Sequence, residues 1–264
     1  MIFAAQTAKI TPSYDFPVKA FRRLGSEDPF KHIGVRADYK TSIDFGIANS
    51  AFIKYGINAI NAGGTIHRSL SMGYSIPIDG TTHYIKMRGT RMEALRLSAN
   101  AESELWTASA DLVSSVIDDP SSSDYIGSGA HATADSTQPW AITEGGAGPI
   151  TWGGSNLNFL DINATFTRNL SNKRTIGDAN IKFQRATIRQ VVADFTVEWL
   201  EGTLEDDLRA GTKRDLSWTL DTGVSVITFS TCRLINLSGR DVDAESTDTM
   251  PMKIGLEAES VNVT

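Results

Sequence analysis

The feature that most constrains this chain is a set of long runs in which apolar and polar residues alternate. In the clearest run, apolar residues occupy every second position from Val191 to Trp199. A period of two places these side chains on one face of a strand. Further alternating runs are Ile33–Phe45, Leu216–Leu220 and Met252–Val261. The sequence therefore predicts a mainly β protein, built as β-sandwich or half-barrel units with short helices, whose sheet edges each need a partner.

The composition fits a globular protein with one or two hydrophobic cores. The chain has 264 residues, of which 41% are hydrophobic and 21% charged, and this excludes a disordered chain or a fibre. The single cysteine, Cys232, excludes an intramolecular disulfide and a Cys-based zinc site. No apolar stretch approaches the ~20 residues of a membrane span, and Met1–Gln6 lacks the features of a secretory signal. We therefore expect synthesis in a reducing cytoplasm and no membrane partner.

The formal net charge of −6 limits the classes of partner. Proteins that hold nucleic acid place Lys and Arg against phosphates and gain affinity by releasing counterions, so an acidic chain is not typical of that class. An acidic surface repels DNA within the Debye length, ~8 Å at physiological salt. The sequence therefore predicts no specific binding of nucleic acid.

The order of expected elements occurs twice. The first half predicts a strand from Ile33, a helix over Ala48–Ile60, a hairpin at Asp79-Gly80 and two further strands, Arg91–Ala99 and Leu105–Val113. The second half predicts a strand over Ile188–Leu200, a helix from Thr203 to Gly211, a hairpin at Gly223 and a last strand over Met252–Val261. Between them lies a stretch rich in Gly, Pro and Ser, which is typical of a loop.

This order favours two tandem β domains. We expect a first domain with an N-terminal extension over residues 1–125, a linker over 126–150 and a second domain over 151–264. The alternative is one large β-rich domain whose strands alternate without duplication. The best-defined helix lies in the second half, because Thr203 suits an N-cap, acids fill the first turn and Gly211 suits a C-terminal cap.

No motif in the chain predicts catalysis, a cofactor or a metal. The four histidines, His32, His67, His83 and His131, do not stand at metal-ligand spacings. There is no P-loop and no nucleophile elbow. Alternating acids at Asp241, Asp243 and Glu245 are the best calcium candidate, yet they lack the glycine and distal Glu of an EF-hand, so a solvated loop is expected. We expect catalytic, cofactor-binding and metal-binding residues to be none.

With the elements placed, the chain resembles the tail tube proteins of tailed bacteriophages and related archaeal viruses. The resemblance runs from Ile33 to the C-terminus and is one of pattern, without an invariant signature. The segments that carry it are Ile66–Val116 with Gly89–Ser98 and Trp106–Leu112, Asn163–Phe166, Ile188–Leu200, Leu204–Leu208 and Asp215–Leu220. Met1–Lys31 and the glycine-rich middle lie outside this pattern.

The resemblance implies a structural protein of the virion tail, made in the host cytoplasm, that is not an enzyme. Proteins of that family form rings whose inner sheets join into a barrel, and the rings stack into a hollow tube through which viral DNA leaves the capsid. A ring of six tube domains implies a trimer of two-domain chains with pseudo-sixfold symmetry, or a hexamer of one-domain chains. The implied partners are other copies, a terminator, a tip or baseplate and a tape measure, with DNA passing through unbound.

Two other functions stay open at this point. One is a β-sandwich binding module of a tail tip, a baseplate or an adhesin, which would not self-assemble into filaments. The other is a carbohydrate-active enzyme whose exposed aromatics line a groove; the candidates are Trp106, Trp140, Trp152, Trp199 and Trp218. If the chain forms a tube, we expect an acidic lumen from the net charge. We also expect Met1–Thr11 and the 120–150 stretch to contact the next ring.

Overall fold

The structure, a computed structural model, describes residues 9–15, 18–22, 29–34, 38–47, 51–61, 69–100, 106–118, 121, 150–157, 159–173, 175, 180–198, 203–219, 226–238 and 251–264. The elements in chain order are β1 (Lys9–Asp15), β2 (Val18–Arg22), β3 (Pro29–Gly34), β4 (Asp38–Gly46), α1 (Ala51–Asn61), β5 (Leu70–Ile78), β6 (Thr81–Asn100), β7 (Thr107–Ser114), β8 (Val116–Ile117), β9 (Thr151–Trp152), β10 (Ser155–Asn156), β11 (Phe159–Lys173), β12 (Phe183–Glu198), α2 (Thr203–Ala210), β13 (Lys213–Thr219), β14 (Val226–Ser238), β15 (Pro251–Glu257) and β16 (Ser260–Val263).

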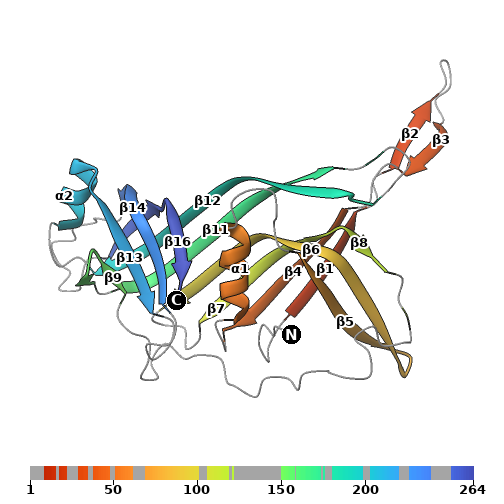
Figure 1. Ribbon diagram of the computed structural model, residues 1–264, viewed down its shortest axis with the longest axis horizontal. Coiled ribbons are helices and arrows are strands. Elements are labelled where there is room, and N and C mark those ends of the chain that lie inside the picture. The colour runs from red at the N-terminus through yellow and green to blue at the C-terminus, as the bar shows by residue number, and fades with distance from the viewer. Residues whose placement is uncertain are drawn as a thin grey trace, which may run out of the picture.

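Almost all described strands belong to one antiparallel sheet, which confirms the predicted mainly β class. Fourteen strands form this sheet, with the order β1-β4-β7-β6-β11-β12-β15-β14-β13-β9-β10 and with β5 and β8 beside β6 and β16 beside β14. The hairpin β2–β3 forms a separate two-stranded sheet. Figure 1 shows β13 and β14 toward the left end of the long axis, β1 and β4 near its middle and the β2–β3 hairpin at the right end, with α1 lying across one face.

The strand pairing follows the same scheme twice. In what we call the first unit, β1 pairs with β4, β4 with β7, and β7 with β6, which also pairs with β5 and β8. In the second unit, β11 pairs with β12, β12 with β15, and β15 with β14, which also pairs with β13 and β16. Helix α1 follows β4 and helix α2 follows β12, at the same place in each scheme.

The two schemes also match at single residues. Residues 39–47 and residues 189–197 have the same succession of exposed, half-buried and buried side chains. Within this pattern Asp44 and Phe45 of β4 correspond to Asp194 and Phe195 of β12. Asp44 and Asp194 are exposed, whereas both phenylalanines are buried in the core. This short identity is the clearest local trace of the repeated scheme in the sequence.

The two units are joined inside the chain by the pairing of β6 with β11. The ladder runs from Asp161 opposite Asn100 to Thr167 opposite Ala94. Behind it, one cluster of buried side chains extends across both units. Trp106, just before β7, contacts Trp218 of β13 with ring centroids 5.0 Å apart. The described residues therefore form one continuous sheet with a shared core.

Helix α1 covers the core face of the first unit. Its apolar side is built from Phe52, Ile53 and Ile57, all of them buried. The helix lies close to β6 because Gly56 has no side chain: a Cβ there would lie 2.7 Å from the Met92 sulfur. Phe52 also meets Phe45 of β4 edge-on, with ring centroids 5.3 Å apart. Among the described residues, no helix has the length and hydropathy of a membrane span.

Several predicted element boundaries are wrong, for related physical reasons. The predicted strand from Ile33 divides between β3 and β4, and the last strand divides into β15 and β16. Conversely, the second arm of the hairpin expected at Asp79-Gly80 and the strand expected over Arg91–Ala99 form a single 20-residue strand, β6. Gly89 in its middle has φ of 61°, and its Cβ would lie 2.8 Å from the Ser115 Oγ. An alternating pattern continues across a break or a bulge, so period alone does not locate either.

Helix α2 agrees with its prediction and fixes one end of β13. It spans Thr203–Ala210, and Gly211 has φ of 65°. The helix is held to the sheet by Asp207, whose carboxylate accepts hydrogen bonds from Arg214 Nε at 2.6 Å and Trp152 Nε1 at 2.9 Å. Burial alone would raise the pKa of Asp207, but the hydrogen bonds and the charge of Arg214 outweigh burial and hold the pKa below its ordinary value.

The first testable prediction concerns this carboxylate. Asp207→Asn should lower the free energy of unfolding at pH 7 by about 2–3 kcal/mol, because hydrogen bonds to a charged group are lost. Since the folded-state pKa is depressed, the stabilisation is present above the ordinary Asp pKa of ~3.9 and is lost as the pH falls through the folded value. Urea unfolding measured between pH 7 and pH 3 should show the two proteins converging at low pH.

The matched control is Asp206→Asn, which removes an exposed carboxylate from the same helix. It should change the stability by less than about 0.5 kcal/mol. A difference between Asp207→Asn and the parent protein that stays constant down to pH 3 would contradict the assigned role of the ion pair.

Candidate functional site

The residues considered for chemistry do not form a reactive site in the described part of the chain. Cys232 of β14 is fully buried, burial raises its pKa to about 12, and its thiol donates to the Phe229 carbonyl at 3.1 Å. His83 of β6 lies opposite Ile76 of β5. The structure describes only the backbone of His32, while His67, His131 and the acids Asp241, Asp243 and Glu245 lie outside the described residues. No group of metal-binding side chains occurs among the residues searched.

The tryptophans pack inside the protein where the structure describes them. Trp106, Trp152 and Trp218 are at most 3% exposed. Trp152 donates its indole hydrogen to Asp207, and the other two rings contact each other at an interplanar angle of 39°. Trp140 and Trp199 lie outside the described residues. The three described rings therefore stabilise the core and are not available to line a sugar-binding groove.

The functional candidate is instead the sheet face that the helices leave uncovered. Directly opposed residues of an antiparallel pair share a face, so the ladders identify its members. They are polar for the most part: Lys9, Thr11, Ser13, Lys40, Ser42, Asp44, Arg96, Ser98, Asn100, Thr107, Ser109, Asp111, Asp161, Asn163, Thr165, Val192, Asp194, Thr196, Arg233, Asn236, Ser238, Lys253, Gly255 and Glu257. We call this set the polar face. It extends across both units.

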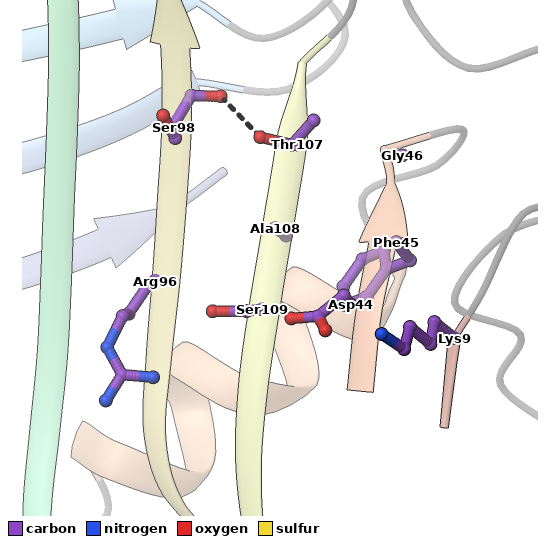
Figure 2. Close-up of a pocket in the computed structure, with 9 residues that line it drawn as sticks. All are labelled: Lys9, Asp44, Phe45, Gly46, Arg96, Ser98, Thr107, Ala108 and Ser109. Atoms are coloured by element: carbon purple, nitrogen blue, oxygen red, sulfur yellow. Dashed lines mark hydrogen bonds between the residues drawn. The ribbon is translucent and has the colours of Figure 1, made fainter. Parts of the chain in front are cut away.

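A hollow of about 410 Å³ lies on the polar face of the first unit. Figure 2 shows that it is lined from β1 by Lys9, from β4 by Asp44 and from β6 and β7 by Arg96 and Ser109. A hollow of about 310 Å³ lies at the corresponding place in the second unit, lined among others by Asn163 and Asp194. Both are shallow depressions between side chains of one sheet.

The two hollows are built from equivalent positions. Asp44 and Asp194 correspond to each other, and the ladders on either side extend the correspondence to their neighbours. The further equivalent pairs are Lys9 and Asn163, Ser109 and Gly255, Arg96 and Asn236, Ser98 and Ser238, and Thr107 and Lys253. The polar face therefore repeats in shape, while its charges differ between the units.

Acids and bases are mixed over this face. In the first unit, Arg96 forms an ion pair with Asp111 at 2.7 Å, and Asp111 also accepts a hydrogen bond from the Ser42 hydroxyl at 2.8 Å. In the second unit, Glu257 lies opposite Arg233 in the ladder. A net charge says nothing of where the charges lie, and this face carries both signs. A face with charges of both signs and mostly short side chains binds a polyanion weakly, because affinity for phosphates depends on clustered cations.

Several strand edges of the sheet have no described partner, and two of them, on β1 and on the end of β14, occupy related places in the repeated scheme. Among the residues that the structure describes, β1 pairs only with β4. The end of β14, residues 234–238, pairs with β15 on one side and has no described strand on the other. Ile10 on β1 and Ile235 on β14 are 37% and 56% exposed, which is high for large apolar side chains. Unpaired strand edges with exposed apolar residues are sites for further strand pairing.

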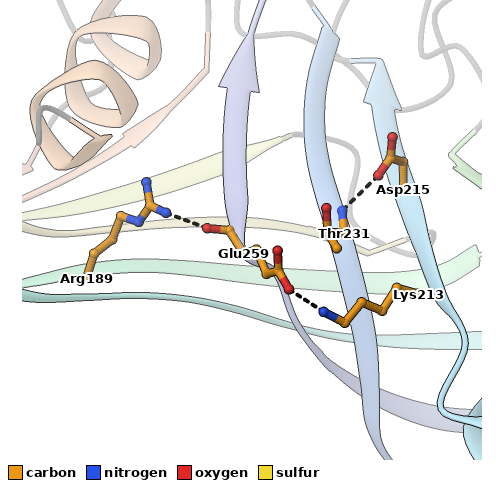
Figure 3. Close-up of polar contacts among 5 residues, drawn as sticks. All are labelled: Arg189, Lys213, Asp215, Thr231 and Glu259. Atoms are coloured by element: carbon orange, nitrogen blue, oxygen red, sulfur yellow. Dashed lines mark hydrogen bonds and ion pairs between the residues drawn. The ribbon is translucent and has the colours of Figure 1, made fainter.

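Polar contacts fix the course of β14 before it reaches its open end (Figure 3). Thr231 has a positive φ of 56°, and its amide donates to the Asp215 carboxylate at 2.8 Å. Glu259, between β15 and β16, accepts from Arg189 through its backbone carbonyl and pairs with Lys213 through its carboxylate. These contacts connect β12, β13 and β14, so the position of β14 is fixed on the side of the chain that leads to its open edge.

Comparison with known protein families identifies the family of the chain. A family model described as phage tail tube protein matches residues 5–263. The match covers nearly the whole chain, including most of Met1–Lys31 and the glycine-rich middle, which the sequence pattern had left out. No curated protein matches the chain.

Proposed function

Since this chain belongs to the phage tail tube protein family, we propose that its copies assemble into rings that stack as the hollow tube of a viral tail. Membership makes it a structural protein of the tail, and the finer statement about assembly rests on one observation: a sheet that continues through two repeated units and leaves the edges of β1 and of residues 234–238 in β14 without a described partner. An open edge that is not paired invites aggregation, whereas a closed ring of copies removes it.

The repeated scheme supports the number of copies in the ring. If each unit is one tube domain, residues 1–125 and 151–264 supply two domains per chain, and three chains complete a ring of six. The units then alternate around the ring and give pseudo-sixfold symmetry. A ring of six chains is the alternative, and it would require only one unit of each chain to face the centre.

The polar face is suited to line the lumen. Many of its side chains are short, such as Ser42, Ser98 and Thr165, and three of its cations lie beside acids: Arg96 pairs with Asp111, Lys9 lies opposite Asp44, and Arg233 lies opposite Glu257. DNA passing along this wall would meet few unpaired cations, so it would release few counterions and would not be held. The proposal includes synthesis in the host cytoplasm, contacts of the finished tube with other tail proteins, and no enzymatic activity.

Negative-stain electron microscopy of the purified chain tests the proposal. We expect rings or hollow filaments at high protein concentration, with threefold or pseudo-sixfold projections. Analytical ultracentrifugation over a wide concentration range gives the second measurement. A single monomeric species at every concentration would contradict self-assembly and would favour a binding module of the tail tip or baseplate.

A further inference from the structure

We propose that the open edge of β14 in one copy receives β1 of the next copy, in the register that β11 uses on β6 within the chain. This inference rests on the proposed ring and adds to it which strands meet and which residues lie opposite each other. The repeated scheme carries it, because the chain itself contains one completed example of the joint.

The completed example is the β6–β11 ladder. On its polar side, Ser98 lies opposite Asn163, and the Ser98 hydroxyl is 2.7 Å from the Asn163 side-chain oxygen. On its core side, Leu97 lies opposite Ala164, and both are 1% exposed. The joint thus combines a main-chain ladder with a polar contact on one face and apolar packing on the other.

Each half of this joint has an equivalent at an open edge. In the repeated scheme β14 corresponds to β6, and β1 corresponds to β11. The register transferred from the example places Ser238 opposite Lys9, Leu237 opposite Ile10, and Asn236 opposite Thr11 of the next copy. The joint begins only after Arg233, because Lys213 of β13 already pairs with that residue.

The exposure of apolar side chains supports the same assignment. Ile10 stands where the example has Ala164, yet it is 37% exposed in the isolated chain. It would meet Leu237, which is half-buried. Ile235 is the additional residue at a register shift of β14 and is 56% exposed beside this site. Burying Ile10 and Ile235 between copies accounts for two of the four exposed large hydrophobics among the described residues.

The geometry of the contact favours a closed assembly. The two surfaces differ, one being the start of the first unit and the other the end of the second, so each copy donates β1 at one end and accepts a strand at the other. Such head-to-tail contacts form a ring when the rotation closes. Strands β4, β7, β6, β11, β12 and β15 lie between β1 and β14 in the sheet order, so the two edges are far apart along the sheet of one chain.

Disulfide trapping tests the register. The double variant Lys9→Cys/Ser238→Cys places two thiols opposite each other across the joint. Opposed residues of an antiparallel pair have Cα atoms about 4.5–5.5 Å apart, which lies within disulfide range. The native Cys232 is fully buried and does not interfere. Under mild oxidation of assembled protein we expect covalent dimers and trimers in a non-reducing gel, with the trimer as the largest closed product.

Two further variants make the result specific. Ser98→Cys/Asn163→Cys is the matched control within one chain, and it should form an intramolecular disulfide and no covalent oligomer. Ser13→Cys/Ser238→Cys shifts one thiol four residues along β1, and it should cross-link at least 10-fold more slowly. Equal rates for the two intermolecular pairs would overturn the register.

The outcomes separate this inference from the proposed function. If the Lys9→Cys/Ser238→Cys chain forms rings or tubes under reducing conditions and does not cross-link on oxidation, while the Ser98→Cys/Asn163→Cys control does, then the tube stands and the joint is wrong. If the parent chain forms no ring or tube at any concentration, the proposed function fails and the joint with it.

Discussion

A chain that lacks residues 1–15 is expected to fold and to remain monomeric. The deletion removes β1, whose Lys9, Ile10, Thr11 and Ser13 are exposed in the single chain, so little buried apolar surface is lost and the core stays intact. The deletion nevertheless removes one side of the proposed β1–β14 joint between copies. Circular dichroism should show unchanged β structure, while ultracentrifugation and negative stain should show no rings.

A point variant makes the same test without shortening the sheet. Ile10→Asp would put a carboxylate opposite Leu237 on the core side of the joint, where it has no counter-charge. Leaving a charge buried without a partner costs at least about 3 kcal/mol, so the concentration needed for rings should rise roughly 100-fold or more. Thr11→Asp is the matched control: it places the same charge one residue away on the polar face, and rings should still form.

These results also decide between two roles of the N-terminal segment. Its sequence alone led us to expect a contact with the next ring, so that losing Met1–Thr11 would spare rings and impair tube growth. Because Lys9–Thr11 lie in β1 and pair with β4, we now expect their loss to act on ring closure. If the shortened chain forms normal rings that fail only to stack, then the N-terminal segment contacts the next ring, as its sequence alone predicted.

The second large effect is expected from the aromatic contact between the units. Trp218→Ala should lower the free energy of unfolding by about 3–5 kcal/mol, because a fully buried ring is lost and the cavity collapses only in part. Trp218 contacts Trp106 with ring centroids 5.0 Å apart. Since these rings come from different units, the loss should also weaken the cooperation between the two halves of the sheet.

A double-mutant cycle measures this cooperation. Trp106→Ala and Trp218→Ala are combined, and denaturant unfolding of all four proteins should give a coupling of about 0.5–1.5 kcal/mol. Phe45→Ala in place of Trp106→Ala is the control, because Phe45 packs against Phe52 within the first unit, and its coupling to Trp218→Ala should be close to zero. Equal couplings in the two cycles would contradict a specific link between the units.

Local patterns in the sequence predicted the elements better than their partners. The alternation at Val191–Val197 predicts strand β12 because each buried side chain lies on one face of a single strand. Capping chemistry placed α2 because its signals lie within a few residues of the helix. Local pattern did not predict that β6 continues through Gly89, since a bulge keeps both flanking patterns intact.

The candidate site was beyond local reasoning for a different reason. The polar face is assembled by pairing across long separations, for example Ser98 with Asn163, and such pairs leave no mark on either strand alone. Charge illustrates the same limit, because the total of −6 gave no indication that Arg96 and Asp111 lie together. One usable signal existed in the Asp-Phe step shared by residues 44–45 and 194–195, which aligns the two units.

The link between β6 and β11 has a consequence for how copies add to one another. The β6–β11 ladder forms when the chain folds, so the edge of β6 is already paired when a second copy approaches. In the proposed joint an incoming β1 therefore pairs with β14, because the equivalent edge of β6 is not available. Around the proposed ring, β6–β11 joints within a chain alternate with β14–β1 joints between chains. The joints within a chain form by folding and need no association of copies, so their residues can change independently of the residues at the joints between copies.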